Sequence, residues 1–269
     1  MRIALVQQHA TQDKQDNLER GLAAVRRAAA GGAQVIGFAE LAFEPFYPQD
    51  PAPASAIELG EEIPGPVTDA LAELASDLGV VLLLNLYERD GDRAFDTTAV
   101  LGTEGQLVGK VRMLHVPDYA CFHERGYYAL GDLGAPVFET PFGRIGVAIC
   151  YDRHYPEVMR ALALNGADVV FVPQAGAVGE WPEGLFEAEM RVASFHNGFF
   201  TALCNRVGQE PKLTFAGESF VTDPHGVVIA CAGEGTDEVL HCTLDLDQVE
   251  ASCARRLFLP DRRPGLFDR

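Results

Sequence analysis

The amino-acid sequence predicts an α/β protein with a mixed β-sheet. Short apolar runs of strand length alternate with segments of helical periodicity, an order that is typical of parallel strands joined by crossover helices. Other strands are joined by tight-turn signals, Asp90-Gly91 and Pro141-Phe142-Gly143, which indicate antiparallel hairpins. Of the 269 residues, 48% are hydrophobic and 22% are charged, so a globular fold is favoured over a disordered chain.

The first half of the sequence predicts five strands and two helices. The strands are expected at residues 3–8, 34–40, 80–87, 96–101 and 107–116. A helix over 16–30 ends at the Gly31-Gly32 pair, and a helix over 67–78 carries apolar residues at near-3.6 spacing. The Pro-rich segment 45–66 is expected to be a structureless surface loop next to Glu40.

The second half predicts the same alternation. Pro156 opens a helix over 157–165 that Gly166 ends, and further elements are a strand at 168–172, a helix at 185–197, a strand at 199–205 and a hairpin over 219–231. We find no repeat and no internal boundary, so we expect one domain over 1–269. The Arg- and Pro-rich tail 254–269 is expected to pack on a partner subunit.

The net charge disfavours two classes of partner. Lys and Arg number 21 and Asp and Glu number 39, which gives a formal net charge of −18. A surface this acidic repels phosphate backbones and anionic lipids, so we expect neither nucleic acid nor membrane as a partner. No run approaches the ~18 apolar residues that span a bilayer, and MRIALVQQ lacks the apolar region of a signal peptide. We therefore expect a cytoplasmic protein.

The six cysteines are expected to be free thiols, because a reducing compartment disfavours disulfides. None of them forms a CxxC pair. His123-Glu124 begins like the zinc motif HExxH, but Tyr127 occupies the position of the second histidine. We therefore expect no metal site.

Three residues place a reactive side chain where chemistry is commonly found. Cys150 ends the apolar run RIGVAIC before a turn into a helix, where backbone N–H groups favour a thiolate and an oxyanion. Glu40 ends QVIGFAE, where apolar surroundings should raise its pKa and suit it to acid–base work. Glu124 lies in the aromatic-rich segment DYACFHERGYY. Each also has a structural reading: a buried cysteine, a solvated strand-end glutamate, and a surface carboxylate paired with Arg125.

Eight segments spread along nearly the whole chain carry a family resemblance. They are MRIALVQQ, VIGFAELAF, GKVRMLHVP, CFHERGYYALGD, GRIGVAICYDRHYPE, ALALNGADVVFVP, ALCNRVG and LFLPDRRPGLF. With them the chain resembles the nitrilase, or carbon–nitrogen hydrolase, superfamily, and the block around Cys150 is highly specific. The nearest branch contains β-ureidopropionases, N-carbamoylputrescine amidases and N-carbamoyl-amino-acid amidohydrolases. The resemblance implies a four-layer αββα sandwich with mixed sheets, a homodimer or higher oligomer, and no metal or organic cofactor.

The resemblance also implies roles for particular residues. Cys150 matches the nucleophile, Glu40 the general base, and Glu124 a second glutamate that orients the site. Arg153 matches an arginine that binds a substrate carboxylate, although a salt bridge is an equally good reading of this residue. The backbone N–H of Tyr151, which follows the nucleophile, is a candidate oxyanion donor.

One position departs from the family pattern. The catalytic lysine lies two residues before the histidine of its segment, and counting back from His115 reaches Met113. Lys110 is three residues from Met113, so the two side chains face opposite sides of an extended strand. His115 shares the parity of Met113 and is a second candidate for the missing donor. Since the loss of one oxyanion donor costs about 10²–10³ in rate, the departure bears directly on turnover.

The sequence therefore leaves three hypotheses. The first is a cysteine-dependent amidohydrolase that cleaves a small N-carbamoyl compound or ω-amide through a thioester. The second is a nitrilase-fold binding protein impaired by Met113. The third is a redox-sensing thiol protein that uses Cys150. Substrate choice is expected to depend on segments 45–66, 119–128 and 174–184, with Arg153 and Arg191 as candidate carboxylate partners.

Overall fold

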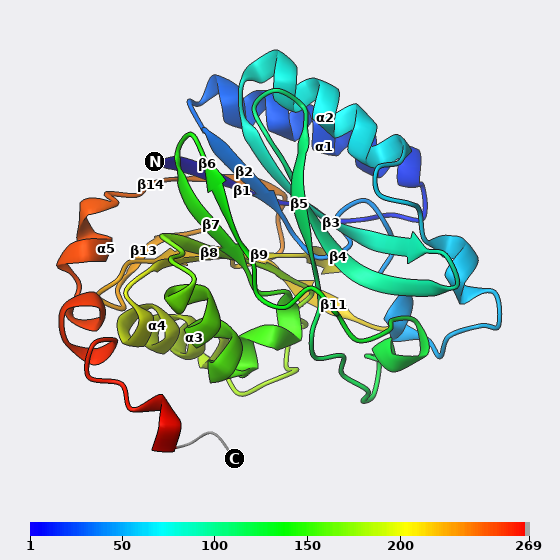
Figure 1. Ribbon diagram of the computed structural model, residues 1–269. Coiled ribbons are helices and arrows are strands. Elements are labelled where there is room, and N and C mark those ends of the chain that lie inside the picture. Colours follow the sequence, from blue (N-terminus) through cyan, green and yellow to red (C-terminus); the bar gives the residue numbers. More distant parts are fainter. Residues whose placement is uncertain (267–269) are drawn as a thin grey trace.

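The computed structural model describes residues 1–266 and shows four layers, in which two mixed sheets face each other and helices cover both outer faces (Figure 1). The elements of the first half-sandwich are β1 Arg2–Gln7, α1 Lys14–Ala30, β2 Val35–Phe38, α2 Pro66–Leu78, β3 Val81–Asp90, β4 Arg93–Leu101, β5 Leu107–Arg112 and β14 Glu238–Thr243. Those of the second are β6 Val137–Thr140, β7 Gly143–Val147, α3 Pro156–Leu164, β8 Val169–Gln174, α4 Leu185–Asn197, β9 Phe200–Asn205, β12 Phe220–Thr222 and β13 Val228–Cys231. The expected αββα sandwich is confirmed.

Each sheet has six strands and mixes parallel with antiparallel pairs. The first has the order β14-β1-β2-β3-β4-β5, and the second has the order β13-β12-β9-β8-β7-β6. In both, three central strands run parallel: β1, β2 and β3 in one and β7, β8 and β9 in the other. Hairpins such as β3–β4 and β6–β7 add the antiparallel edges. The turn signals at Asp90-Gly91 and at 141–143 therefore predicted the correct pairings.

Local sequence signals explain the helix ends. The Asp13 side chain accepts hydrogen bonds from the N–H groups of Gln15 and Asp16 and so caps α1. Pro66 begins α2, where its missing N–H costs nothing, and Gly79 ends the helix in the left-handed conformation at φ 63°. α4 has the predicted bounds.

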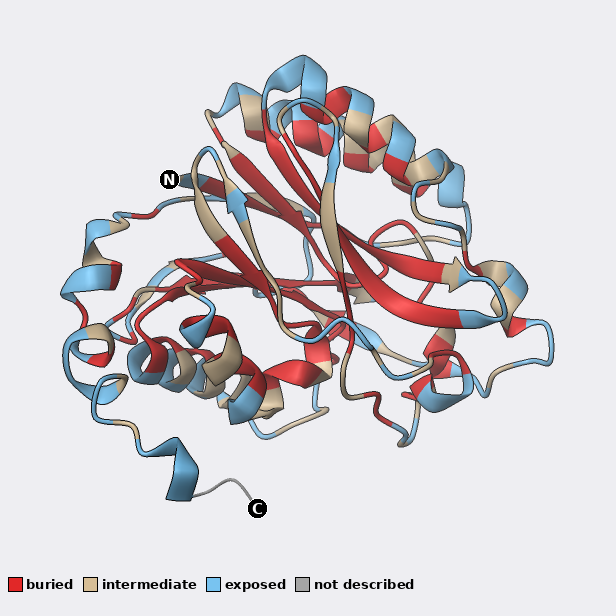
Figure 2. Ribbon diagram, in the orientation of Figure 1, coloured by how far each residue is buried: buried red, intermediate tan, exposed pale blue. Residues whose placement is uncertain are grey.

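Apolar side chains fill the three interfaces between the four layers. One cluster joins α1 and α2 to the first sheet, a second joins α3 and α4 to the other sheet, and the largest lies between the sheets. Figure 2 shows the consequence: the strands are buried along most of their length, whereas the helices expose one face. At Gly37 a Cβ would lie 2.8 Å from the Phe171 ring, so the two sheets approach closely where β2 crosses β8.

Several expectations about boundaries are wrong. The segment 45–66 is not structureless, since it contains 3₁₀ turns at Tyr47–Gln49 and Ala56–Leu59. The strand expected at 107–116 ends at Arg112, and the strands expected to end at Glu40 and Cys150 end at Phe38 and Val147. Both residues thus lie in the loops after the strands. The strands β10 Val207–Gln209 and β11 Thr214–Ala216, and also β14, were not predicted.

The C-terminal segment contacts its own chain. It contains α5 Asp247–Ala251, a π-helical turn Ala254–Phe258 and a 3₁₀ turn Pro264–Leu266. The Arg255 guanidinium donates to the carbonyl oxygens of Ala163 and Ala167 at 2.9 and 2.7 Å. Packing of the tail 254–269 on a partner stays a prediction, and its last three residues lie outside the described part. Among residues 1–266, no helix has the length and apolar character needed to cross a membrane.

Candidate active site

The three residues singled out by sequence lie together at the carboxyl ends of the central strands. Glu40 follows β2, Cys150 follows β7, and Glu124 begins a 3₁₀ turn, Glu124–Gly126, between β5 and β6. The exposed fractions are 0% for both glutamates and 6% for Cys150. The charges of Glu40 and Glu124 both raise the pKa of the Cys150 thiol, so the three buried groups lie near one another. The surface-carboxylate reading of Glu124 is therefore wrong.

Two strained turns present these side chains. Cys150 begins the 3₁₀ turn Cys150–His154 with φ 43°, and Leu41, directly after Glu40, has φ 45°. A non-glycine residue in the left-handed region costs of order 1–3 kcal/mol, so surrounding contacts must hold it there. The Arg153 guanidinium does this for the first turn by donating to the Cys150 carbonyl oxygen at 2.8 Å.

The Cys150 thiol is protonated in the resting site. Burial raises its pKa most, and Glu40 and Glu124 raise it further, while Arg153 lowers it. We expected the backbone N–H groups of the turn to favour the thiolate, and that expectation has the wrong sign here. A protonated thiol needs a base, and Glu40 is the carboxylate that acts most strongly on it.

Burial raises the pKa of Glu40, as its position after an apolar strand predicted. No N–H or hydroxyl group among residues 1–266 donates to either carboxylate oxygen. The groups that lower its pKa are the Cys150 thiol, the Asp96 carboxyl and the Arg206 charge, in that order. The Glu40 carboxyl group therefore lies beside the sulfur and has no N–H or hydroxyl partner among the described residues.

Glu124 is equally isolated. Burial raises its pKa well above the usual range, and the charges of Glu40 and Asp96 add to the shift. Within the described chain, its two carboxylate oxygens have no hydrogen-bond partner, and neither has the nearby Tyr128 hydroxyl. Since a buried polar group without a partner is costly, these atoms are suited to a bound polar ligand.

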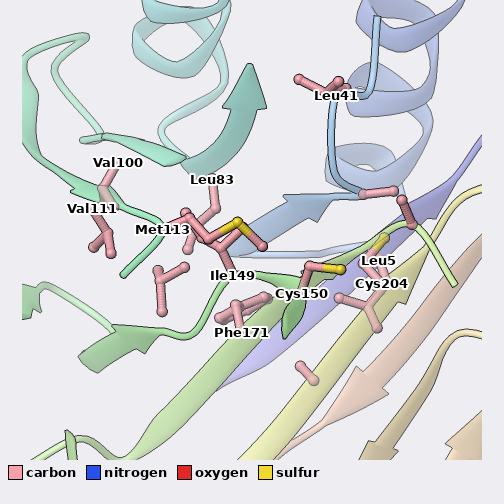
Figure 3. Packing of buried hydrophobic residues seen from close by; sticks show 14 of the residues in the cluster. Leu5, Leu41, Leu83, Val100, Val111, Met113, Ile149, Cys150, Phe171 and Cys204 are labelled. Carbon is pink, nitrogen blue, oxygen red and sulfur yellow. The ribbon is translucent and has the colours of Figure 1, made fainter. Parts of the chain in front are cut away.

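Neither candidate for the missing ammonium reaches these acids. Met113 is 1% exposed and packs in the apolar cluster that also contains Leu83, Ile149 and Cys150 (Figure 3). Lys110 forms an ion pair with Glu88 instead. The His115 ring bonds Asp152 at 2.8 Å and stacks on Tyr155 with ring centroids 3.5 Å apart.

Arg153 and Tyr151 flank the nucleophile in different ways. The Arg153 guanidinium is buried, donates to the Gln174 side chain at 2.7 Å, and pairs with Glu189 at 3.2 Å. Its Nη2 is buried without a partner among the described residues, so one nitrogen is left for a ligand. The Tyr151 ring packs edge-on to the rings of His154 and Tyr155.

Sequence reasoning missed three charged residues of this site. Asp96 and Arg206 both interact with Glu40, and Glu180 raises the pKa values of Glu40, Glu124 and Cys150. A carboxylate inside the apolar strand 96–101 and an arginine directly after the strand 199–205 were visible signals. The described residues include no cluster of His, Cys, Asp and Glu that could hold a metal ion.

Comparison with known proteins places this geometry in a family. The carbon–nitrogen hydrolase family model matches residues 2–252. N-carbamoylputrescine amidase of Solanum lycopersicum is 32% identical over 279 aligned residues, which cover 98% of this chain and 93% of that protein. The crystal structure of a carbon–nitrogen hydrolase from Helicobacter pylori G27 is 26% identical, with a TM-score of 0.93 and coverage of 99% and 97% of the two chains.

A further similar structure shows a covalent adduct on an active-site cysteine. It is a glutamate-to-glutamine variant of the amidase from Nesterenkonia sp. AN1, which is 27% identical with a TM-score of 0.83 and covers 99% of this chain and 95% of its own. That protein carries the acetamide moiety of fluoroacetamide on its active-site cysteine. The fold and the sequence of this chain thus have counterparts among known amidases, and this chain belongs to the carbon–nitrogen hydrolase family, as a hydrolase that acts on amides.

Proposed function

We propose that the protein hydrolyses the C–N bond of a small N-carbamoyl amine, N-carbamoyl amino acid or ω-amide, with Cys150 as nucleophile and Glu40 as general base. One observation carries the proposal: a protonated, buried thiol faces two buried carboxylates that receive no N–H or hydroxyl hydrogen bond from residues 1–266. Such a group of unpaired polar atoms is costly unless a substrate completes it. The family relatives are amidases of this kind.

In this mechanism Glu40 takes the thiol proton while the sulfur attacks the substrate carbonyl carbon. The negative charge moves to the carbonyl oxygen, and the backbone N–H of Tyr151, directly after the nucleophile, is the proposed donor that stabilises it. The C–N bond then breaks, and the proton held by Glu40 goes to the leaving nitrogen, which departs as ammonia or an amine. Water then gives a proton to Glu40 and attacks the thioester, the C–S bond breaks, and Glu40 returns this proton to the sulfur, so one hard cleavage becomes two easier steps.

Glu124 and Arg153 serve substrate binding in this proposal. Glu124, kept neutral by burial, donates a hydrogen bond from its carboxyl group or accepts one from the substrate's amide. The unpaired Nη2 of Arg153 suits a substrate carboxylate, whereas Glu180 favours a substrate amine. The substrate class therefore includes small molecules with a charged tail.

The proposed assembly is a cytoplasmic homodimer of single-domain chains. α4 and the segment that follows α5 expose apolar side chains: Val192 52%, Phe195 38%, Leu257 55% and Phe258 38%. The Phe195 and Phe258 rings contact each other edge-on, which joins the two elements in one apolar surface. A surface of this kind is typical of a subunit interface.

An acid-quenched reaction tests the covalent step. Wild-type protein is mixed with each member of a panel of N-carbamoyl amino acids, N-carbamoyl amines and ω-amides, and the reaction is quenched with acid. The protein is then digested, and the peptide masses are measured by mass spectrometry. We expect a substrate-derived mass on the peptide that contains Cys150. The buried Cys204 is an internal control that should stay unmodified. If no substrate of the panel modifies Cys150 and none releases ammonia, the proposal is wrong.

Met113 favours a second reading, in which the protein binds amides but turns them over poorly. The Met113→Lys variant separates the two readings. We expect the wild type to be active and the variant to change kcat/KM by less than about tenfold, because the site already holds Glu40 ionised by other means. A gain of about 10²–10³ from a barely active wild type would support the impaired protein instead. Lys110→Met is the matched control, since Lys110 pairs with Glu88.

A further inference from the structure

A third buried acid, Asp96, lies beside Glu40 and has no role in the proposed function. Asp96 belongs to β4 and is 0% exposed. Its Oδ1 accepts a hydrogen bond from Asn85 Nδ2 at 2.5 Å, while its buried Oδ2 receives no hydrogen bond from an N–H or hydroxyl group of residues 1–266. A buried carboxylate oxygen without a partner is rare, so this atom needs an explanation.

The β3–β4 hairpin fixes the position of Asp96. Asn85 of β3 lies opposite Thr98, two residues along from Asp96. Asn85 Nδ2 donates to Asp96, and Asn85 Oδ1 accepts a hydrogen bond from the backbone N–H of Leu41 at 2.8 Å. Leu41 directly follows Glu40, so a single amide side chain ties the Asp96 carboxyl to the turn that presents Glu40.

Asp96 is also tied to the position where the family resemblance expects a lysine. The backbone N–H of Met113 donates to the Asp96 carbonyl oxygen at 2.9 Å. Met113 supplies no charge there. Position 96 therefore lies directly beside the position where the family pattern has its lysine.

The surrounding charges do not allow every acid to ionise. The ionisable and charged groups that act on Glu40 and Asp96 are Cys150, Glu124, Tyr128, Asp152, Glu180 and Arg206. Of these, only Arg206 is a cation. Burial and the charge of Glu40 hold the pKa of Asp96 well above its usual range, and the Asp96 carboxyl in turn lowers the pKa of Glu40 as a hydrogen-bond partner. Two adjacent carboxyl groups with one cation nearby share a proton.

We propose that Asp96 is a positioning residue that keeps its proton at neutral pH and donates it in a hydrogen bond to the Glu40 carboxylate. This inference rests on the proposed role of Glu40 as general base. The bond holds Glu40 ionised and oriented toward Cys150, a task that the family pattern gives to a cation. No proton is lost in the step, because Glu40 takes the thiol proton while Asp96 retains its own.

The pH dependence of kcat/KM for Asp96→Ala and Asp96→Asn tests the inference. In Asp96→Ala, Glu40 loses its donor, its pKa rises, and the acid limb of the profile moves to higher pH. The plateau falls on the order of 10- to 100-fold, the usual effect of losing a hydrogen bond to a charged group. In Asp96→Asn, the amide still donates, so the acid limb stays in place and most of the activity returns.

If Asp96 is ionised, the acid limb of the kcat/KM profile shifts in the opposite direction, and this result would overturn the inference. Both variants would then remove a repulsive charge, and both acid limbs would move to lower pH. If Asp96→Ala does not fold, Asp96→Asn alone still distinguishes an unchanged limb from a lowered one. Asp168→Asn is the control, because Asp168 is a buried acid that pairs with Arg144 and should leave the acid limb unchanged.

Infrared difference spectra test the protonation of Asp96 without turnover. Their result therefore does not depend on whether the proposed function is correct. Wild type minus Asp96→Asn at pH 7 should show the loss of a protonated-carboxyl band. The loss of an ionised-carboxylate band instead would overturn the inference whether or not the protein hydrolyses the amide tested.

Discussion

The Cys150→Ala variant should lose about 10⁴-fold or more of kcat/KM for every amide that the wild type hydrolyses. The thiol supplies the covalent step, and no other nucleophile occupies its position after β7. Ammonia release measures the loss. The fold should survive, because alanine fills the same left-handed turn and Arg153 still holds the carbonyl oxygen of residue 150.

Cys204→Ala is the matched control for this variant. Cys204 is also buried in the apolar cluster between the sheets, and its thiol donates to the Val6 carbonyl oxygen at 3.3 Å. The substitution removes the same atoms but should keep turnover within about threefold, at a stability cost of about 1 kcal/mol. If Cys150→Ala retained activity close to that of Cys204→Ala, the sulfur of Cys150 would not be the nucleophile.

Periodicity and turn chemistry predicted the elements because their causes are local. The α4 bounds and the turns of the β3–β4 and β6–β7 hairpins depend on apolar spacing and on Gly and Pro at particular positions. The strands before Glu40 and Cys150 were predicted too long, because the residues after each strand remain apolar and buried although the ladder has ended. Burial alone does not distinguish a strand from the buried loop that follows it.

The candidate site was predictable in its nucleophile and two acids but not in the residues that hold them. Asn85 ties Asp96 to the turn that presents Glu40, which requires the β3–β4 register and a hydrogen bond from the Leu41 N–H to the Asn85 side chain, 44 residues away. Glu189 pairs with Arg153 from a different helix. The sign of the Cys150 pKa shift depends on the sum of burial and three carboxylates, which a single motif does not contain.

Arg206→Met should destabilise the protein by about 3–5 kcal/mol, the typical cost of breaking a buried ion pair. Arg206 is 1% exposed and follows β9. Its guanidinium donates to the carbonyl oxygens of Glu40 and Glu44, both at 2.9 Å, and pairs with the buried Glu210. Methionine would leave these acceptors and the Glu210 charge uncompensated.

Thermal unfolding measures the effect, and a fall in Tm of roughly 10 °C is expected for a chain of this length. Arg144→Met is the matched control, because Arg144 is a partly exposed arginine paired with Asp168, and its loss should cost only about 1 kcal/mol. The double variant Arg206→Met with Glu210→Gln should recover part of the lost Tm, because the uncompensated charge of Glu210 is removed. Equal falls in Tm for Arg206→Met and Arg144→Met would refute the structural role.

The Arg206→Met variant also tests the effect of Arg206 on the pKa of Glu40. The Arg206 charge lowers the pKa of Glu40, so its removal should raise that pKa. Glu40 then stays protonated to higher pH, and the acid limb of the kcat/KM profile of the folded Arg206→Met protein moves upward. An unmoved limb would mean that Arg206 holds the backbone of Glu40 without acting on its charge. Under the proposed roles, losing the Arg206 charge and losing the Asp96 hydrogen bond should therefore both raise the pKa of Glu40.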